Sequence, residues 1–89
     1  MIILYDEQFI EKFTHIYNFI SKDSINRADI FKNDLKKHIE LIPLFPYKAR
    51  RSKWFEDEQI RDLIFKGYTI PYLIDEDKIV ILDIFKWER

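Results

Sequence analysis

The residues of this chain whose types and spacing could support binding chemistry gather in one segment, YKARRSKW, at positions 47–54. Four cations stand there between two aromatic residues: Lys48, Arg50, Arg51 and Lys53 between Tyr47 and Trp54. Cations interleaved with aromatic rings can hold phosphate groups and stack on bases, so contact with a phosphate-bearing partner is one interpretation of the segment. The acidic run EDE follows at 56–58, and a loop that merely packs beside it would show the same composition.

A second group of cations lies near the end of the chain, where Lys86 and Arg89 flank Trp87, with Arg61 upstream. Lysine is a poor general base at neutral pH unless burial lowers its pKa by several units. These cations therefore suit phosphate binding better than proton transfer. Alternatively, Lys86 only extends over the sheet edge and Arg89 belongs to a frayed end.

Other acid–base or metal chemistry finds little support in the sequence. The histidines, His15 and His38, lie beside the apolar stripes of predicted helices, where surface or boundary positions are expected. The adjacent acids at 56–58 belong to a predicted loop and do not form a pair aimed at one bond. No metal site is predicted.

Two amphipathic helices are predicted in the first half of the chain. Asp6 is placed to cap a helix over residues 7–21, in which apolar residues recur every three or four positions. Asp23 or Ser24 is the next cap, and the apolar stripe of the second helix ends before Pro43. Because the connection is so short, the two helices are expected to pack antiparallel as a hairpin.

The second half is predicted to be a loop followed by an antiparallel meander. Residues 43–58 lack periodicity and contain two prolines, which is typical of an irregular connection. Three runs of branched and aromatic residues then predict strands over residues 59–65, 68–74 and 78–85. The last run is apolar on nearly both faces, so it should be central in the sheet, with the first five residues as a neighbouring strand.

Periodicity also predicts the core and one irregularity in the sheet. The expected core residues come from both helices and the last strand: Phe13, Ile16, Phe31, Leu35, Val80, Leu82 and Ile84. Pro71 lacks the N–H that a ladder needs, so its strand should bulge or remain open on one side at that position. The pattern predicts an α+β domain whose two helices pack on one face of a mainly antiparallel four-stranded sheet.

Composition limits the class of protein. A chain of 89 residues is a single domain, 1–89, and its 47% hydrophobic content is sufficient for a core. It contains no cysteine, which excludes a disulfide-stabilised secreted scaffold and makes the cytoplasm the expected location. The opening run MIILY is too short for a signal sequence or a membrane span. A net charge of −1 disfavours binding of nucleic acid over the whole surface.

The order of these features and three stretches of sequence resemble the RelE/ParE superfamily of bacterial type II toxin–antitoxin toxins. The stretches are FISKDSINRADIFKNDL, then FPYKARRS, and finally IRDLIFKGYTIPYLID continued by KIVILDIFKWER. Together they span nearly the whole chain. The resemblance implies a RelE/ParE-like fold and a cognate antitoxin as partner, with no cofactor, no membrane association and no small-molecule substrate.

The superfamily contains two mechanisms, and the fold alone does not choose between them. RelE-like members enter the ribosomal A site and cut mRNA, whereas ParE-like members poison DNA gyrase. The cations of the nuclease pattern are absent at the places that resemble it, which hold other residues here: Ile60, Asp62, Thr69 and Trp87. Apolar, acidic and hydroxyl side chains cannot neutralise the negative charge of a phosphorane-like transition state. The resemblance therefore favours a docking surface on the open face of the sheet.

The sequence is therefore interpreted as a ParE-like toxin that acts by binding, with DNA gyrase as the target that the resemblance suggests. The expected target-binding residues are the two basic groups: Lys48, Arg50, Arg51, Lys53, Trp54, Lys86, Trp87 and Arg89. One alternative is a ribosome-dependent mRNA interferase that uses Arg61, Lys86 and Arg89, and another is a member that binds antitoxin without being toxic. The antitoxin is expected to contact aromatic residues outside the periodic core: Tyr47, Trp54 and Trp87.

Overall fold

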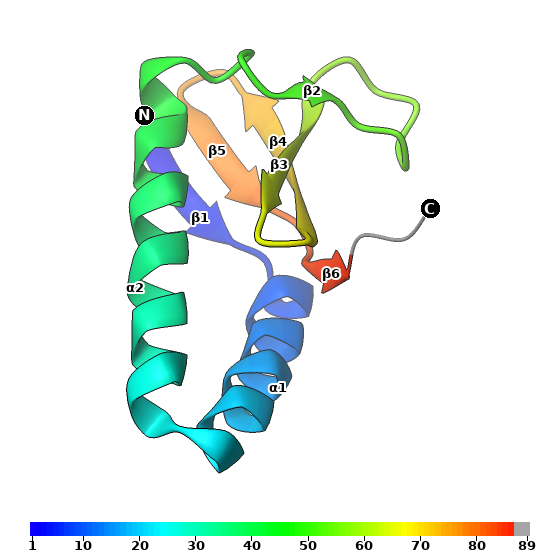
Figure 1. Cartoon of the computed structure of the whole chain (residues 1–89). Helices are drawn as coiled ribbons and strands as arrows, with labels where there is room; N and C mark the ends of the chain where they lie inside the picture. The colour runs from blue at the N-terminus through cyan, green and yellow to red at the C-terminus, as the bar shows by residue number, and fades with distance from the viewer. Residues whose placement is uncertain (87–89) are drawn as a thin grey trace.

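The computed structural model describes residues 1–86, so Trp87 and Arg89, both expected target contacts, lie outside the described residues. The elements follow one another in this order: β1 (Ile2–Tyr5), α1 (Glu7–Asp23), α2 (Ile25–Leu41), the 3-10 helix η1 (Ile42–Leu44), β2 (Arg50–Arg51), β3 (Ile60–Phe65), β4 (Tyr68–Asp75), β5 (Lys78–Ile81) and β6 (Phe85–Lys86). Figure 1 shows helices α1 and α2 beside the sheet, which confirms the predicted α+β fold. Neither helix is long and apolar enough to cross a membrane.

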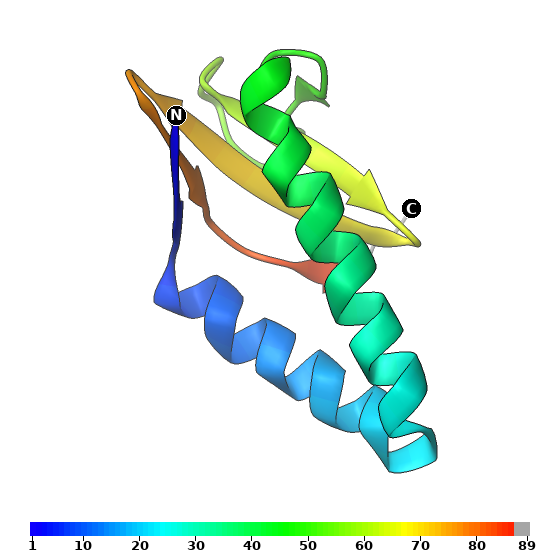
Figure 2. The same ribbon diagram turned by 90° about the vertical axis from the view of Figure 1, so that its left-hand side faces the viewer.

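Both helices begin at a capping side chain. The Asp6 carboxylate accepts a hydrogen bond from the Gln8 N–H at 2.8 Å, and the Ser24 hydroxyl accepts one from the Arg27 N–H at 3.1 Å. These bonds satisfy amides that the first helical turn leaves without a partner. The helices form the expected hairpin, in which they meet at the short turn and diverge away from it (Figures 1 and 2).

The sheet is mixed, with the strand order β1-β5-β4-β3-β2 and with β6 paired to β4. β1 runs parallel to β5, with Leu4 opposite Val80, and the other pairs are antiparallel. The N-terminal strand therefore flanks β5, as predicted. The predicted strand over residues 78–85 is wrong in extent, because β5 ends at Ile81 and β6 is a separate strand. β4, not β5, is the middle strand of the order.

Pro71 lies where β4 changes its partner strand. β4 pairs with β5 from Tyr72 onward and with β6 only through Tyr68 and Thr69. The Pro71 carbonyl accepts a hydrogen bond from the Leu82 N–H at 2.9 Å. Because the nitrogen and carbonyl of one strand residue face the same side, the missing N–H faces the interval between β5 and β6. The predicted irregularity is confirmed.

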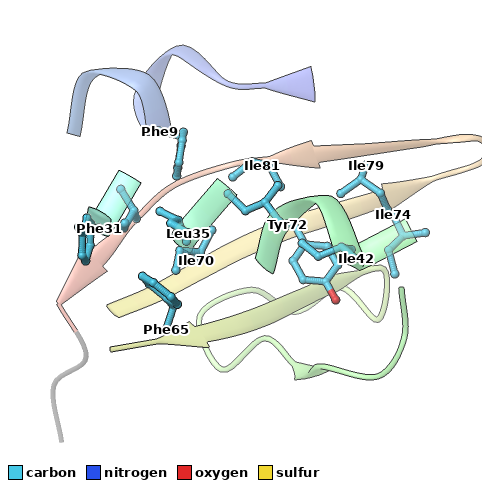
Figure 3. Packing of buried hydrophobic residues seen from close by; sticks show 12 residues of the cluster. Phe9, Phe31, Leu35, Ile42, Phe65, Ile70, Tyr72, Ile74, Ile79 and Ile81 are labelled. Carbon is cyan, nitrogen blue, oxygen red and sulfur yellow. The ribbon is translucent and has the colours of Figure 1, made fainter. Parts of the chain in front are cut away.

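The core lies between the helices and one face of the sheet (Figure 3). The predicted core residues Phe31, Leu35 and Ile84 are buried, while Phe13 and Ile16 are partly buried against the core. This core also includes residues outside the predicted set: Phe9, Ile39, Ile42, Phe65, Ile70, Tyr72, Ile74, Ile79 and Ile81.

The prediction that Val80 and Leu82 belong to the core is wrong. Both are only partly buried, and the alternate residues Ile79 and Ile81 are 0% exposed instead. Residues one apart in a strand face opposite sides of a sheet, so the choice of face depends on register. Because both alternating sets are apolar here, their hydrophobicity gives no signal for the register.

Candidate functional site

The basic segment is attached to the sheet by the buried side chain of Asp62. One carboxylate oxygen of Asp62 accepts a hydrogen bond from the Lys53 backbone N–H at 3.1 Å and pairs with the Arg50 guanidinium at 3.4 Å. Arg50 and Asp62 are also opposite each other in the β2–β3 ladder. A buried carboxylate requires such partners, because desolvation disfavours an isolated charge. Asp62 therefore fixes the course of the loop.

Arg61 holds the same loop from the other face of β3. Its guanidinium donates hydrogen bonds to the backbone carbonyls of Glu58 and Ala49, both at 3.3 Å. It also lies 5.0 Å from the centroid of the Tyr47 ring. Tyr47 in turn donates its hydroxyl to the Gln59 side-chain oxygen at 2.5 Å. These contacts make Arg61 a residue that orders the loop.

The structure does not bring Arg61 and Lys86 together at one reaction centre. Arg61 is opposite Tyr72 on one side of β4, and Lys86 is opposite Tyr68 on its other side. Four residues along a strand correspond to about 13 Å. The Lys86 amine lies 5.3 Å from the Tyr68 ring centroid, away from the contacts of Arg61. Groups that act on one phosphate must all lie within hydrogen-bond distance of it, so this pair does not form a nuclease site.

The three described positions that resemble the nuclease pattern are buried. Ile60, Asp62 and Thr69 belong to the face of the sheet opposite the core, and each is less than a tenth exposed. Thr69 is opposite Phe85 of β6, whose ring contacts Trp54 of the loop. The expectation that this face is open does not hold at these three positions, where the loop reaches Asp62 through the Lys53 N–H and Trp54 packs against Phe85 beside Thr69.

The expected target-binding residues separate into two groups on either side of the loop. Lys48 and Arg50 line a cavity of about 580 Å³ between the end of α2, η1 and β3. Trp54 and Lys86 line a different cleft of about 420 Å³. Arg51 pairs at 3.8 Å with Glu58 of the acidic run. The basic segment is therefore not a single contact surface.

The cleft beside β6 combines aromatic rings with one cation and one carboxylate. Its lining comes from the loop and from the residues that follow β5: Trp54, Phe55, Asp83, Phe85 and Lys86. The rings of Trp54 and Phe85 meet edge to face, with centroids 5.3 Å apart. Asp83 forms an ion pair with Lys12 of α1 at 3.1 Å. We call this set the aromatic cleft.

The larger cavity is apolar, with cations at its rim. Its walls are supplied by the end of α2, η1 and the following turn, the start of β2, and β3 and β4: His38, Leu41, Ile42, Leu44, Phe45, Lys48, Ala49, Arg50, Asp62, Leu63, Ile64 and Tyr72. We call this set the edge groove. The Tyr72 hydroxyl donates to the Pro46 carbonyl at 2.6 Å, which anchors the turn that follows η1. Burial raises the pKa of Tyr72 to about 12, and the nearby Arg61 guanidinium opposes that rise.

Sequence reasoning missed three apolar residues of the two sites. Leu44, Phe45 and Phe55 lie in the segment without periodicity, so no pattern assigned them to a face. The feature that could have revealed them is the presence of large apolar residues in a predicted loop, because a fully solvent-exposed loop seldom contains several of them. Both histidines are exposed as predicted, and His38 lines the edge groove. Within residues 1–86, no three His, Asp or Glu side chains form a group that could hold a metal ion.

Comparison with known proteins relates this fold to toxins. The family model described as ParE toxin of type II toxin–antitoxin system, parDE, matches residues 3–89. A solved chain of the chromosomal ParDE toxin–antitoxin system from P. aeruginosa is 17% identical with a TM-score of 0.81, and the match covers 99% of this chain and 97% of that one.

A second solved structure, of a conserved hypothetical protein from Helicobacter pylori, is also 17% identical. Its TM-score is 0.53, and the match covers 97% of this chain and 93% of that one. At such low identity these likenesses concern the fold alone. No curated protein matches this chain significantly.

Proposed function

Because the chain belongs to the ParE toxin family of type II toxin–antitoxin systems, we propose that it acts by binding a target such as DNA gyrase and is neutralised by a cognate antitoxin. The observation that supports binding over RNA cleavage is the placement of Arg61 and Asp62. Arg61 donates to two backbone carbonyls of the loop, and Asp62 is buried against Arg50 and Lys53. The polar groups of both side chains are therefore used to hold the loop in place.

The aromatic cleft is the surface that we assign to the target. Trp54 is 52% exposed although it packs against Phe85, and Phe55 beside it is 40% exposed. Tryptophan is one of the residues enriched among the few side chains that dominate the energy of a protein interface. Lys86 supplies a cation at the rim of the cleft. A target with an apolar anchor and an acidic or phosphate group would complement this surface.

Inhibition of purified DNA gyrase tests this proposal. We expect the protein to inhibit supercoiling and to accumulate cleaved DNA complexes, and we expect Trp54→Ala to lose at least about tenfold in potency, because an interface anchor contributes 1.4 kcal/mol or more. Phe19→Ala is the matched control, because Phe19 is an exposed aromatic residue of α1 that does not line the cleft. It should inhibit gyrase as the unmodified protein does.

The mRNA interferase alternative predicts the opposite result. Induced cells would then show codon-phased mRNA cuts by primer extension, and these cuts would disappear in an Arg61→Ala variant. Gyrase would be unaffected. Such an outcome would contradict the proposal, whereas gyrase inhibition without phased cuts supports it. Action on gyrase would also place the protein in the cytoplasm, and neutralisation by an antitoxin would suit a role in plasmid stabilisation.

A further inference from the structure

The sheet has an open edge beside the edge groove. β2 pairs with β3 only through Arg61 and Asp62, so the rest of β3 has β4 as its one neighbouring strand within the described residues. The Ile60 carbonyl accepts a hydrogen bond from the Ser52 N–H, on the β2 side of β3. Every second residue of a strand directs its backbone groups to the same side, so those of Ile64 face the open edge.

No strand within residues 1–86 pairs with this edge of β3 beyond β2. Lys48 precedes β2 and would be the next residue to pair with Ile64, but its N–H donates to the Phe45 carbonyl at 3.1 Å. The backbone therefore turns away from β3 at this position. An edge strand with unpaired N–H and C=O groups is a template for another extended segment.

The apolar walls of the edge groove lie directly beside this backbone. Leu63 and Ile64 contribute from β3, while Leu41, Leu44 and Phe45 contribute from the opposite wall. The three opposite residues are among the most exposed large apolar side chains in the described part of the chain. Side chains of an added strand alternate between two faces, so one of them could enter the groove while the backbone pairs with Ile64.

The charges around the groove are positive. Lys48 is exposed and forms no ion pair within residues 1–86, and the Arg50 guanidinium also lines the groove. Asp62 is the one carboxylate in the lining, but its side chain is buried and paired with Arg50. An acidic side chain in the occupant would therefore meet a complementary rim.

We propose that the edge groove binds an extended segment of the antitoxin as an added strand beside Ile64. This segment inserts an apolar side chain between Leu44 and Ile64 and places an acidic side chain near Lys48. The proposal rests on the proposed function, which supplies the antitoxin. The outer strand β1 is a second open edge, but the cavity of about 270 Å³ that it borders at Tyr5 lies between α1 and α2.

Amide hydrogen exchange measures strand addition directly. The probe is the cognate antitoxin, sought as the product of a small reading frame adjoining this gene, bound to the full chain. We expect exchange of the Ile64 amide to slow at least about tenfold in the complex, because the added strand accepts its hydrogen bond. Ile3 of β1 is the matched control. The Ile2 and Asp6 amides donate to the carbonyls of Asp77 and Ile81, on the β5 side of β1. The Ile3 amide, which alternates with them, therefore faces the outer edge of the sheet.

Two pairs of variants separate the groove from general surface effects. Leu44→Ser and Lys48→Glu should each weaken binding of that protein by about tenfold, because an apolar contact and a charge contact are lost. Ile25→Ser is the control for the first, because Leu44 and Ile25 are both 67% exposed and Ile25 lies at the hairpin turn. Lys22→Glu, also near the turn, makes the same charge change as Lys48→Glu. Both controls should bind within about twofold of the unmodified chain.

The outcomes distinguish this inference from the proposed function. If the unmodified chain binds but Ile64 remains unprotected and all four variants bind normally, the groove assignment is overturned and the antitoxin proposal stands. If the adjoining protein does not bind at all, both are overturned. Protection of Ile3 instead of Ile64 would place the strand at β1. Protection of Ile64 in the concentrated free chain, lost on dilution, would identify a second copy as the occupant and would overturn the assignment.

Discussion

At the scale of single residues, two buried polar side chains determine the form of the loop that separates the two surfaces. Asp62 binds the Lys53 amide and the Arg50 guanidinium, and Tyr72 binds the Pro46 carbonyl. Neither role was visible in the sequence, because both depend on partners more than eight residues away. Asp62 was instead interpreted as an acid at a nuclease-like position. The interpretation that this position lacks a catalytic cation remains, but its physical role is structural.

The hydroxyl of Tyr72 makes a specific pH dependence expected. Burial raises its pKa to about 12 from an ordinary value near 10, so the unfolded chain loses this proton at lower pH than the folded chain does. Its contribution to stability is fully present below pH 10 and is lost as the pH rises toward 12. A difference of two pKa units between the folded and unfolded chain corresponds to about 2–3 kcal/mol in the free energy of unfolding.

Urea unfolding between pH 8 and 11.5 checks this expectation against a Tyr72→Phe variant. The stability of the unmodified chain should fall more steeply above pH 10 than that of the variant. Burial at Tyr5 and the Asp29 hydrogen bond at Tyr17 also raise pKa values, but both groups are present in both proteins. Parallel pH profiles would show that the Tyr72 hydroxyl does not carry the effect.

At the scale of elements, the last predicted strand shows where sequence patterns succeed and where they fail. The strand type and its neighbour β1 were predictable, because Ile and Val are frequent there and the alternatives were few. The face that this strand turns toward the core was not predictable, because the residues on both of its faces are apolar. The break after Ile81 was foreshadowed by Pro71 on the neighbouring strand, whose missing N–H removes the ladder bond at that point.

The corrected register predicts which core truncation is costly. Ile81 is 0% exposed and contributes to the core, so Ile81→Ala should reduce the free energy of unfolding by roughly 2–5 kcal/mol. Leu82 is only partly buried on the opposite face, and Leu82→Ala should cost about half of that or less. Denaturant unfolding of the two variants measures the difference. An equal or larger loss at Leu82 would contradict the register.

At the scale of the whole molecule, the loop from η1 to β3 separates two surfaces of different character. The edge groove lies between the end of α2 and β3, while the aromatic cleft lies beside β6 on the other side of the loop. The sequence places Lys48, Arg50 and Trp54 in one basic segment, so these three residues were predicted to contact the same target. Folding separates them, because Arg50 pairs with Asp62 at the β3 edge of the sheet, whereas Trp54 packs against Phe85 of β6 on the other side of β4.

This separation predicts that toxicity and neutralisation can be disrupted independently. Trp54→Ala changes only the aromatic cleft, so it should abolish growth inhibition while the chain still copurifies with its antitoxin at close to normal yield. Lys48→Glu changes only the rim of the edge groove, so it should stay toxic and should inhibit growth even when the antitoxin is produced with it. Growth assays and copurification of the two variants measure both properties. If each variant lost toxicity and antitoxin binding to the same extent, one continuous surface would serve both partners, because a single contact region couples the two losses.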